Sequence, residues 1–354
     1  MNASAVSHKP LFNRSKQREQ RETFLLLNEA SPAFNYLTHL TSLGLVSFGL
    51  IVSGSFAIIQ SATGHFLPHD LRYLSMDPYQ LCGLAQGRVA GFMFHDRVSF
   101  GGALIAIGLL YLWLDSNPLK SCEAWAWWTL LITGLAGFGS FLAYLGYGYL
   151  DHLHALATLV LLPLYIAALI RYRPSPSHLL SPLSQLTARH ARPFHDLTHL
   201  TYLSHLTPLR LGRSLLVVTA LGLILGGATI MLIGMTCVFV PQDLGYLKLG
   251  ASDLLAINRR LLPLIAHDRA GFGGAIATCG LLLFSITWFA RPSRNLWRTV
   301  TLACAIGFAT AIVVHPLIGY NDPSHLAPAY LGAILFAAGA IVCHKPMCRE
   351  ETLS

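Results

Sequence analysis

The sequence predicts an all-α integral membrane protein whose eight transmembrane helices form two tandem four-helix bundles. Composition is the first observation: 54% of the 354 residues are hydrophobic, 11% are charged, and the mean hydropathy is +0.54. Soluble domains carry about 25% charged residues. The composition therefore excludes a soluble enzyme, a disordered chain and a soluble nucleic-acid-binding domain. Eight apolar segments and an internal repeat are the second and third observations.

Each apolar segment is long enough, or nearly long enough, to cross a bilayer. A hydrocarbon core of roughly 30 Å needs about 20 apolar residues in a helix. We expect spans at 37–60, 97–114, 124–147, 154–171, 214–236, 270–290, 298–318 and 325–343. The loops 61–94 and 237–266 are expected to form short amphipathic helices that lie on the membrane surface or cover the bundle.

Lys and Arg are distributed unevenly between the two sides of the predicted membrane. If the N-terminus is cytoplasmic, 17 of the 24 Lys and Arg residues fall in cytoplasmic segments and seven in outer loops. The positive-inside rule then predicts that both termini are cytoplasmic, and we expect a bacterial inner membrane. This asymmetry accounts for the net charge of +8, so the expected partner is the lipid bilayer and not a nucleic acid.

An internal repeat relates the two halves of the chain. Residues 95–110 and 267–282 are identical at ten of 16 positions, and both begin with His-Asp-Arg. Shorter matches join 36–41 to 202–207, 66–74 to 239–247, and 148–154 to 319–325. Because each half holds four spans, both halves insert in the same orientation, and we expect a pseudo-two-fold axis along the membrane normal.

These patterns divide the chain into five regions. We expect a basic cytoplasmic segment (1–35), a first four-helix repeat (36–171), a cytoplasmic His/Pro-rich linker (172–201), a second four-helix repeat (202–343) and a cytoplasmic tail (344–354).

Both halves keep the same polar residues at the predicted extracytoplasmic ends of the spans. Ionisable residues at membrane depth are costly and are usually functional. The first half contributes Asp70, His95, Asp96, Arg97, Asp151 and His154, and the second contributes Asp243, His267, Asp268, Arg269, Asp322 and His325.

The histidine spacing predicts haem ligation within each half. His95 and His154 begin the second and fourth spans, and His267 and His325 occupy the matching places. These two spans are diagonal neighbours in an up-down-up-down bundle. Two imidazoles at one depth suit the axial positions of a haem iron. We therefore expect His95/His154 and His267/His325 as ligand pairs.

The neighbouring charged residues have matching expected roles. Arg97 and Arg269 suit the two propionates of a haem, because a guanidinium binds a carboxylate in fork geometry. The carboxylates are expected to orient imidazoles through the second ring nitrogen, or to pair with the arginines and close the outer face. These acidic residues are Asp96, Asp151, Asp268 and Asp322.

Other interpretations of the His-Asp-Arg clusters stay open. The clusters are compatible with interfacial anchors, a non-haem metal, or a proton or substrate pathway. The competing function is a transporter, or an accessory subunit of a membrane complex, with no haem. A transporter predicts polar residues through the membrane midplane, and the expected spans contain few.

This arrangement resembles the haem A synthase family, which has eight spans, two similar halves and paired histidines at the extracytoplasmic ends of spans two and four of each half. The matching histidines are His95, His154, His267 and His325, with Arg97 and Arg269 close by. Position 92 is Phe, where the family has a Glu associated with oxidation of a haem methyl group.

The resemblance implies a membrane oxidoreductase that binds haem b or a related haem. Its activity would be electron transfer or haem modification at the extracytoplasmic side. We further expect a quinone or another membrane redox partner.

Overall fold

The computed structural model describes residues 41–142, 146, 149, 151–175 and 207–348, and every regular element in these ranges is a helix. Eight helices of this part of the chain are long and apolar enough to cross a membrane. They are α3 (Ser42–Ala62), α6 (Arg88–Ser116), α7 (Ala124–Leu142), α8 (His152–Arg171), α11 (Pro208–Met235), α14 (Leu261–Phe289), α15 (Arg294–Ile318) and α16 (Pro323–Cys348). Each of the eight expected spans falls on one of these helices, as far as its residues are described. The expected N-terminal segment and most of the linker lie outside the described residues.

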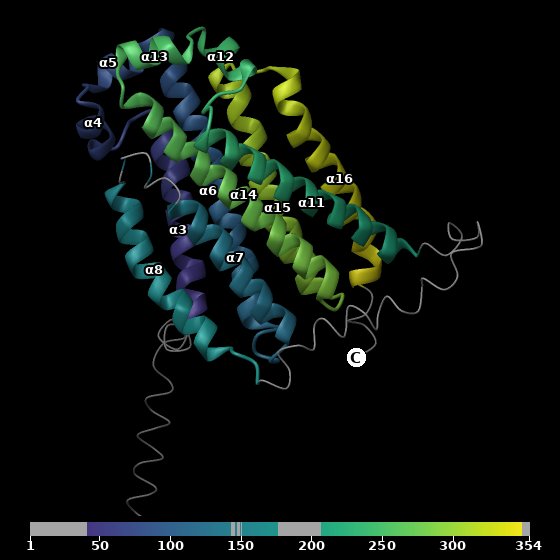
Figure 1. Cartoon of the computed structure of the whole chain (residues 1–354). Coiled ribbons are helices and arrows are strands. Elements are labelled where there is room, and N and C mark those ends of the chain that lie inside the picture. The colour runs from purple at the N-terminus through teal and green to yellow at the C-terminus, as the bar shows by residue number, and fades with distance from the viewer. Residues whose placement is uncertain (1–40, 143–145, 147–148, 150, 176–206, 349–354) are drawn as a thin grey trace, which may run out of the picture. The chain divides into compact units, whose positions relative to one another are not determined.

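Both long loops contain the expected short helices. The first holds α4 (Pro68–Leu74), α5 (Pro78–Gly83) and the 3₁₀ helix η1 (Leu84–Gly87), and the second holds α12 (Pro241–Leu247) and α13 (Ala251–Ile257). Figure 1 shows α4, α5, α12 and α13 gathered at one end of the long helices. The amide of Asn258 donates a 2.7 Å hydrogen bond to the carbonyl oxygen of Leu74, which joins the two loops. We call this end of the molecule the short-helix end.

Helices α6 and α14 begin earlier than the sequence predicts. We expected the His-Asp-Arg segments to open these spans, but α6 starts at Arg88 and α14 at Leu261, so His95 and His267 lie about two turns inside their helices. The preceding turns carry apolar side chains such as Phe92 and Leu264, which are fully buried among the short helices. That burial stabilises the extra turns and corrects the expected helix starts.

The two halves of the chain interlock instead of forming two separate bundles. Helix α6 of the first half packs mainly on α3 and α15, and α14 of the second half packs on α11, α6 and α7. Close approach depends on glycine: a Cβ atom added at Gly102 would lie 1.8 Å from Thr310 Oγ1, and one at Gly274 would lie 1.9 Å from Ser140 Oγ. Each contact joins a residue of one half to a residue of the other.

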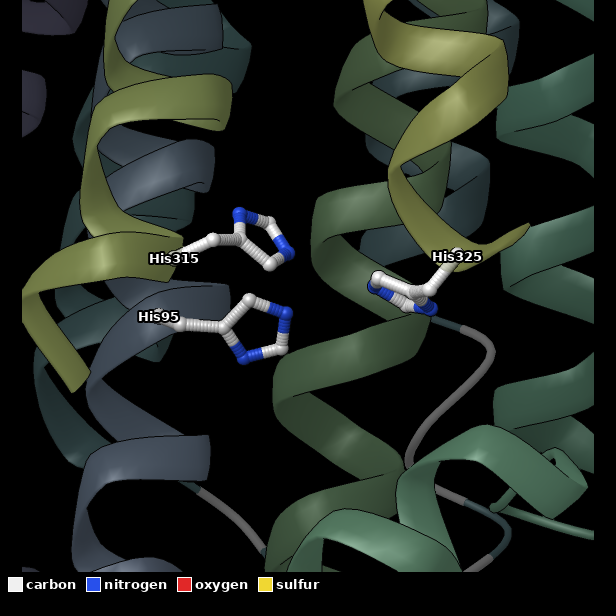
Figure 2. A group of neighbouring side chains, drawn as sticks. All are labelled: His95, His315 and His325. Atoms are coloured by element: carbon white, nitrogen blue, oxygen red, sulfur yellow. The ribbon is translucent and has the colours of Figure 1, made fainter. Parts of the chain in front are cut away.

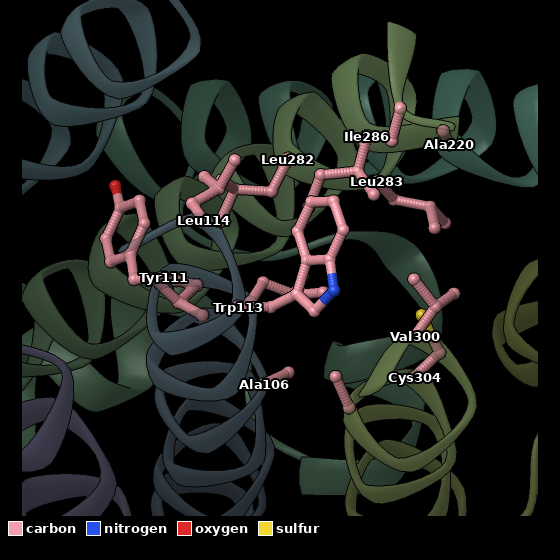
Figure 3. Packing of buried hydrophobic residues seen from close by; sticks show 14 of the residues in the cluster. Ala106, Tyr111, Trp113, Leu114, Ala220, Leu282, Leu283, Ile286, Val300 and Cys304 are labelled. Atoms are coloured by element: carbon pink, nitrogen blue, oxygen red, sulfur yellow. The ribbon is translucent and has the colours of Figure 1, made fainter. Parts of the chain in front are cut away.

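The hydrophobic core also crosses between the halves. Figure 3 shows the indole of Trp113 on α6 among side chains of α14 and α15, including Leu283 and Val300. Trp113 is 7% exposed and Leu283 is fully buried. Helix α6 therefore lies in the interior formed by helices of both halves. This packing fixes the depth and direction of the polar side chains near the first turns of α6.

Candidate functional site

Arg97 links two carboxylates from different halves. Its Nη1 atom lies 2.6 Å from Asp70 Oδ2, and its Nε atom lies 2.8 Å from Asp268 Oδ2. The hydroxyl of Tyr149 donates to the other oxygen of Asp70 at 2.7 Å. Burial raises the pKa of Tyr149, and the neighbouring Asp70 charge raises it further, so the phenol stays a donor.

Arg269 has a similar set of partners in the second half. It donates to Asp243 Oδ2 and, at 2.7 Å, to the carbonyl oxygen of Val238. Its Nε atom lies 3.8 Å from Asp96 Oδ2 of the first half. The Tyr320 hydroxyl donates to Asp243 Oδ1 at 2.8 Å. The geometry displays both roles expected for the carboxylates, because Asp268 pairs with Arg97 and also contacts a ring nitrogen of His267.

His154 and His267 form the first histidine cluster, with Asp151 beside them; we call these three residues the cavity cluster. The Nδ1 atom of His154 lies 3.1 Å from the Nε2 atom of His267. The other ring nitrogen of His267 lies 3.0 Å from Asp268 Oδ1. An imidazole held by a carboxylate in this way keeps one tautomer and presents its second nitrogen in a fixed direction.

Asp151 caps the N-terminus of α8 and binds a further histidine. Its Oδ1 atom accepts hydrogen bonds from the backbone amides of Leu153 and His154. The same oxygen lies 3.2 Å from His69 Nε2, and this contact with the carboxylate raises the pKa of His69. Burial acts to raise the pKa of Asp151, but the His69 bond and nearby positive charge lower it overall. Asp151 therefore orients the first turn of α8, where His154 is located.

A second cluster contains His95 of α6, His315 of α15 and His325 of α16; we call it the three-histidine cluster. Figure 2 shows the His95 and His315 rings side by side and facing the His325 ring. One ligand-type nitrogen from each ring lies within 4.8 Å of the other two. His95 and His315 are buried, and the His325 side chain is 20% exposed.

The expected histidine pairing is therefore corrected. We expected His95 with His154 and His267 with His325, each pair within one half. Instead, His95 meets His325, with ring centroids 6.3 Å apart, and His154 meets His267, with centroids 5.0 Å apart. The physical reason is that α6 and α14 pack on helices of both halves: α6 lies against α3 and also α15, and α14 lies against α11 and also α6 and α7.

Asp322 has a different role from the one expected. Its Oδ1 atom accepts from the backbone amide of His325 at 2.9 Å and from the Ser324 hydroxyl at 2.6 Å. Asp322 thus caps α16 and positions His325 through the backbone and not through the imidazole.

An apolar cavity of about 500 Å³ adjoins the cavity cluster. Its lining comes mainly from α3, α6, α7, α8 and α14, and the ionisable residues among it are Arg97, Tyr111, Asp151, His154, Tyr165, His267 and Asp268. The other end reaches Tyr111 and Tyr165, whose hydroxyl groups lie 3.1 Å apart. Phe56 and Leu156 line it and are about half exposed, so the cavity opens toward the membrane-facing surface between α3 and α8.

Two site residues were missed by sequence reasoning. His69 and His315 have no histidine at the matching position of the other half, where the sequence has Gln242 and Tyr144, so the repeat did not select them. The available signal was His315 itself, because an imidazole within an apolar span needs a partner or a function.

Comparison with known proteins gives no relative for this chain. No family model, no curated protein and no solved structure matches it. The functional argument therefore depends on the geometry of the two clusters and the cavity.

Proposed function

We propose that this chain is a haem-binding membrane oxidoreductase that holds a haem in the cavity beside His154 and His267. The observation that carries this proposal is the meeting of two imidazoles at the polar end of an apolar cavity of about 500 Å³. Haem sites combine axial imidazoles with an apolar pocket that excludes water. A bound haem would supply one-electron redox chemistry at this position.

The residues around the cavity are compatible with a haem. His267 is fixed by Asp268, whereas the His154 side chain is 29% exposed and borders open space. Iron–nitrogen bonds of roughly 2 Å place two axial nitrogens about 4 Å apart. The observed 3.1 Å is shorter and the two rings are stacked, so binding of both to one iron would require the partly exposed His154 ring to turn away from His267. Phe100 and Phe141 flank His154, with centroids 6.0 and 4.7 Å from it, and suit a flat aromatic ligand.

Arg97 borders the cavity but is held by Asp70 and Asp268. We propose that its charge contributes to the potential at the polar end of the cavity, where haem propionates would lie, without leaving its carboxylate partners. Arg269 and Asp96 do not line this cavity, so we assign them no role in holding the haem.

The proposal also covers the symmetry that relates the two halves and the orientation of the chain in the membrane. We propose that a pseudo-two-fold axis along the membrane normal relates the halves, and that the short-helix end is extracytoplasmic. Support comes from the matched partners of Arg97 and Arg269, and from the Lys and Arg distribution. A lipid-soluble electron carrier of the quinone class would reach the cavity from the membrane between α3 and α8.

The competing transporter interpretation has less support. A transport path needs polar or ionisable groups across the membrane midplane. The cavity instead continues as an apolar lining to the hydroxyl groups near Tyr165, about 16 Å from His154 along α8. This lining favours a bound apolar molecule over a path for ions.

Absorption spectroscopy tests the haem proposal directly. The chain is expressed with ample haem and purified in detergent, and its reduced-minus-oxidised spectrum is recorded with a pyridine haemochrome assay. We expect a Soret band and an α band that disappear in His154→Ala and His267→Ala but persist in the matched control His344→Ala. His344 makes an edge-to-face contact with Trp297 and belongs to neither cluster. Absence of haem absorption in the wild-type protein would reject the proposal.

A further inference from the structure

The three-histidine cluster has the geometry of a mononuclear metal site. Its rings come from three helices, and the ligand-type nitrogens lie within 4.8 Å of one another. Ligands of one ion with bonds of 2.0–2.1 Å lie at most about 4 Å apart. The three side chains therefore need shifts of less than about 1 Å to bind one ion together. Figure 2 shows the His95 and His315 rings on one side and the His325 ring opposite them.

His315 supplies an independent observation. Its side chain is buried at 6% exposure, and neither ring nitrogen makes a hydrogen bond of normal geometry. A buried polar group without a partner costs about 1–3 kcal/mol, and such groups in native proteins mark strain, function or an absent ion. A metal bound at this ring would satisfy one of the two nitrogens.

The neighbours of the cluster orient its rings for ligation. The Nδ1 atom of His95 lies 2.6 Å from the carbonyl oxygen of Phe92, so Nδ1 carries the hydrogen and Nε2 keeps its lone pair. Ligating imidazoles characteristically donate their second N–H to a carbonyl or carboxylate. Tyr320 stacks on the His325 ring with centroids 4.5 Å apart and limits its rotation.

The local charge favours a cation. Two buried carboxyl groups adjoin the cluster: Asp96 lies beside His95, and Asp243 Oδ1 lies 4.0 Å from His325 Nδ1. Arg269 contacts both carboxyl groups. Neither oxygen of the Asp96 carboxylate makes a hydrogen bond. The Nε2 atom of His95 lies 3.5 Å from Asp96 Oδ1, so a positive ion bound at His95 would lie beside this carboxyl group.

We propose that His95, His315 and His325 bind one divalent transition-metal ion at a site separate from the proposed haem. Three neutral imidazoles suit zinc, copper or another late first-row ion and not magnesium or calcium, which prefer oxygen ligands. Three protein ligands leave a coordination position open, as in catalytic zinc sites. The proposal does not depend on haem, because none of its ligands lines the cavity.

Metal titration of the full chain in detergent tests the proposal. After removal of metals by a chelator, Zn²⁺ binding is measured by calorimetry, and Co²⁺ binding by its visible absorption. The measurements are repeated in a His154→Ala background, so that the cavity cluster does not contribute. We expect one Zn²⁺ per chain in that background. Replacing one of the three histidines is expected to lower the Zn²⁺ affinity at least 10-fold, because loss of a residue that only hydrogen-bonds to a metal ligand already lowers metal affinity by about that factor.

The variants separate a metal site from a structural role. His315→Ala and the more exposed His325→Ala are both expected to weaken Zn²⁺ binding, while His344→Ala leaves it unchanged. Size-exclusion profiles and thermal unfolding without metal identify any variant that fails to fold. If one of the two variants fails to fold, the Zn²⁺ affinity of the other tests the proposal. Unchanged Zn²⁺ affinity in the folded variants would overturn the proposal, as would haem absorption that is lost with His315→Ala. Haem absorption that is absent from every protein would reject only the proposed function.

Discussion

The Nδ1 atom of His154 lies 3.1 Å from the Nε2 atom of His267, although 113 positions separate the two residues in the chain. His154 belongs to α8 of the first half and His267 to α14 of the second. A ligand that binds both rings therefore binds both halves. Its binding would stabilise the interlocked arrangement, because binding to the folded state alone shifts the unfolding equilibrium.

The contact between Gly102 and Thr310 predicts which glycine substitutions are tolerated. A Cβ atom at position 102 would lie 1.8 Å from Thr310 Oγ1, so Gly102→Ala forces α6 and α15 apart. Overpacking of this kind costs about 1–3 kcal/mol. We expect a lower thermal unfolding temperature in detergent.

Gly139→Ala is the matched control for this substitution. Nothing lies within 4 Å of a Cβ atom at Gly139 of α7. A helical Gly→Ala change without a clash is expected to leave stability unchanged or to raise it by about 0.4–1 kcal/mol. Equal unfolding temperatures for the two variants would contradict the close contact of α6 with α15 at Gly102.

The ion pairs of Arg97 predict strong destabilisation when one partner is removed. Asp70 is fully buried, and the Asp268 side chain is 5% exposed. Arg97→Gln leaves these carboxylates without their cation, which costs about 3–5 kcal/mol for a buried pair. Chemical unfolding of the variant in detergent measures this loss.

Two comparisons test whether the ion pairs of Arg97 cause this loss of stability. The exposed Arg72 gives a control, since Arg72→Gln is expected to stay within about 0.5 kcal/mol of the wild type. In a double-mutant cycle, Arg97→Gln with Asp268→Asn should destabilise less than the sum of the single changes. Strict additivity would mean that the two residues are not coupled.

The bond between His69 and Asp151 predicts a pH-dependent contribution to stability. The pKa of His69 is raised by this contact with Asp151, and the pKa of Asp151 is lowered overall. The raised histidine pKa stabilises the folded chain fully below the unfolded value of about 6.5, and the benefit is lost as the pH rises through the folded pKa. The lowered aspartate pKa stabilises above about 3.9, and that benefit is lost as the pH falls through the folded pKa.

His69→Gln is therefore expected to destabilise most between about pH 4 and 6.5 and progressively less at higher pH. Unfolding temperatures of the wild type and the variant across this range provide the measurement, with the exposed His65→Gln as the control. A difference that grows above pH 7 would contradict the assigned sign.

The cavity predicts that one face of α8 controls ligand uptake. Ala157 lines the cavity, and Ala155 on the same helix does not. Ala157→Phe places a ring in the cavity and is expected to reduce the haem bound per chain several-fold, whereas Ala155→Phe retains it. Haem content is read from the pyridine haemochrome, and the size-exclusion profile confirms folding. Equal haem content in both variants would place the haem elsewhere.

Much of the fold could be predicted from the sequence because the signals are local. Long apolar runs predicted the eight spans, since a membrane helix must satisfy its own backbone hydrogen bonds. The repeat directed attention to His95, His154, His267 and His325, and the structure places all four in two clusters near the short-helix end.

Tertiary structure alone decided which of these residues meet. A repeat indicates that two halves are alike, but not which helix each span takes as its neighbour. Contacts such as Gly102 with Thr310 and the burial of Trp113 carry α6 into the second half, so His95 meets His325 and His154 is left to meet His267. The third histidine, His315, joins the cluster for the same reason: helix packing brings α15 against α6, and this packing depends on side-chain complementarity between residues far apart in the sequence.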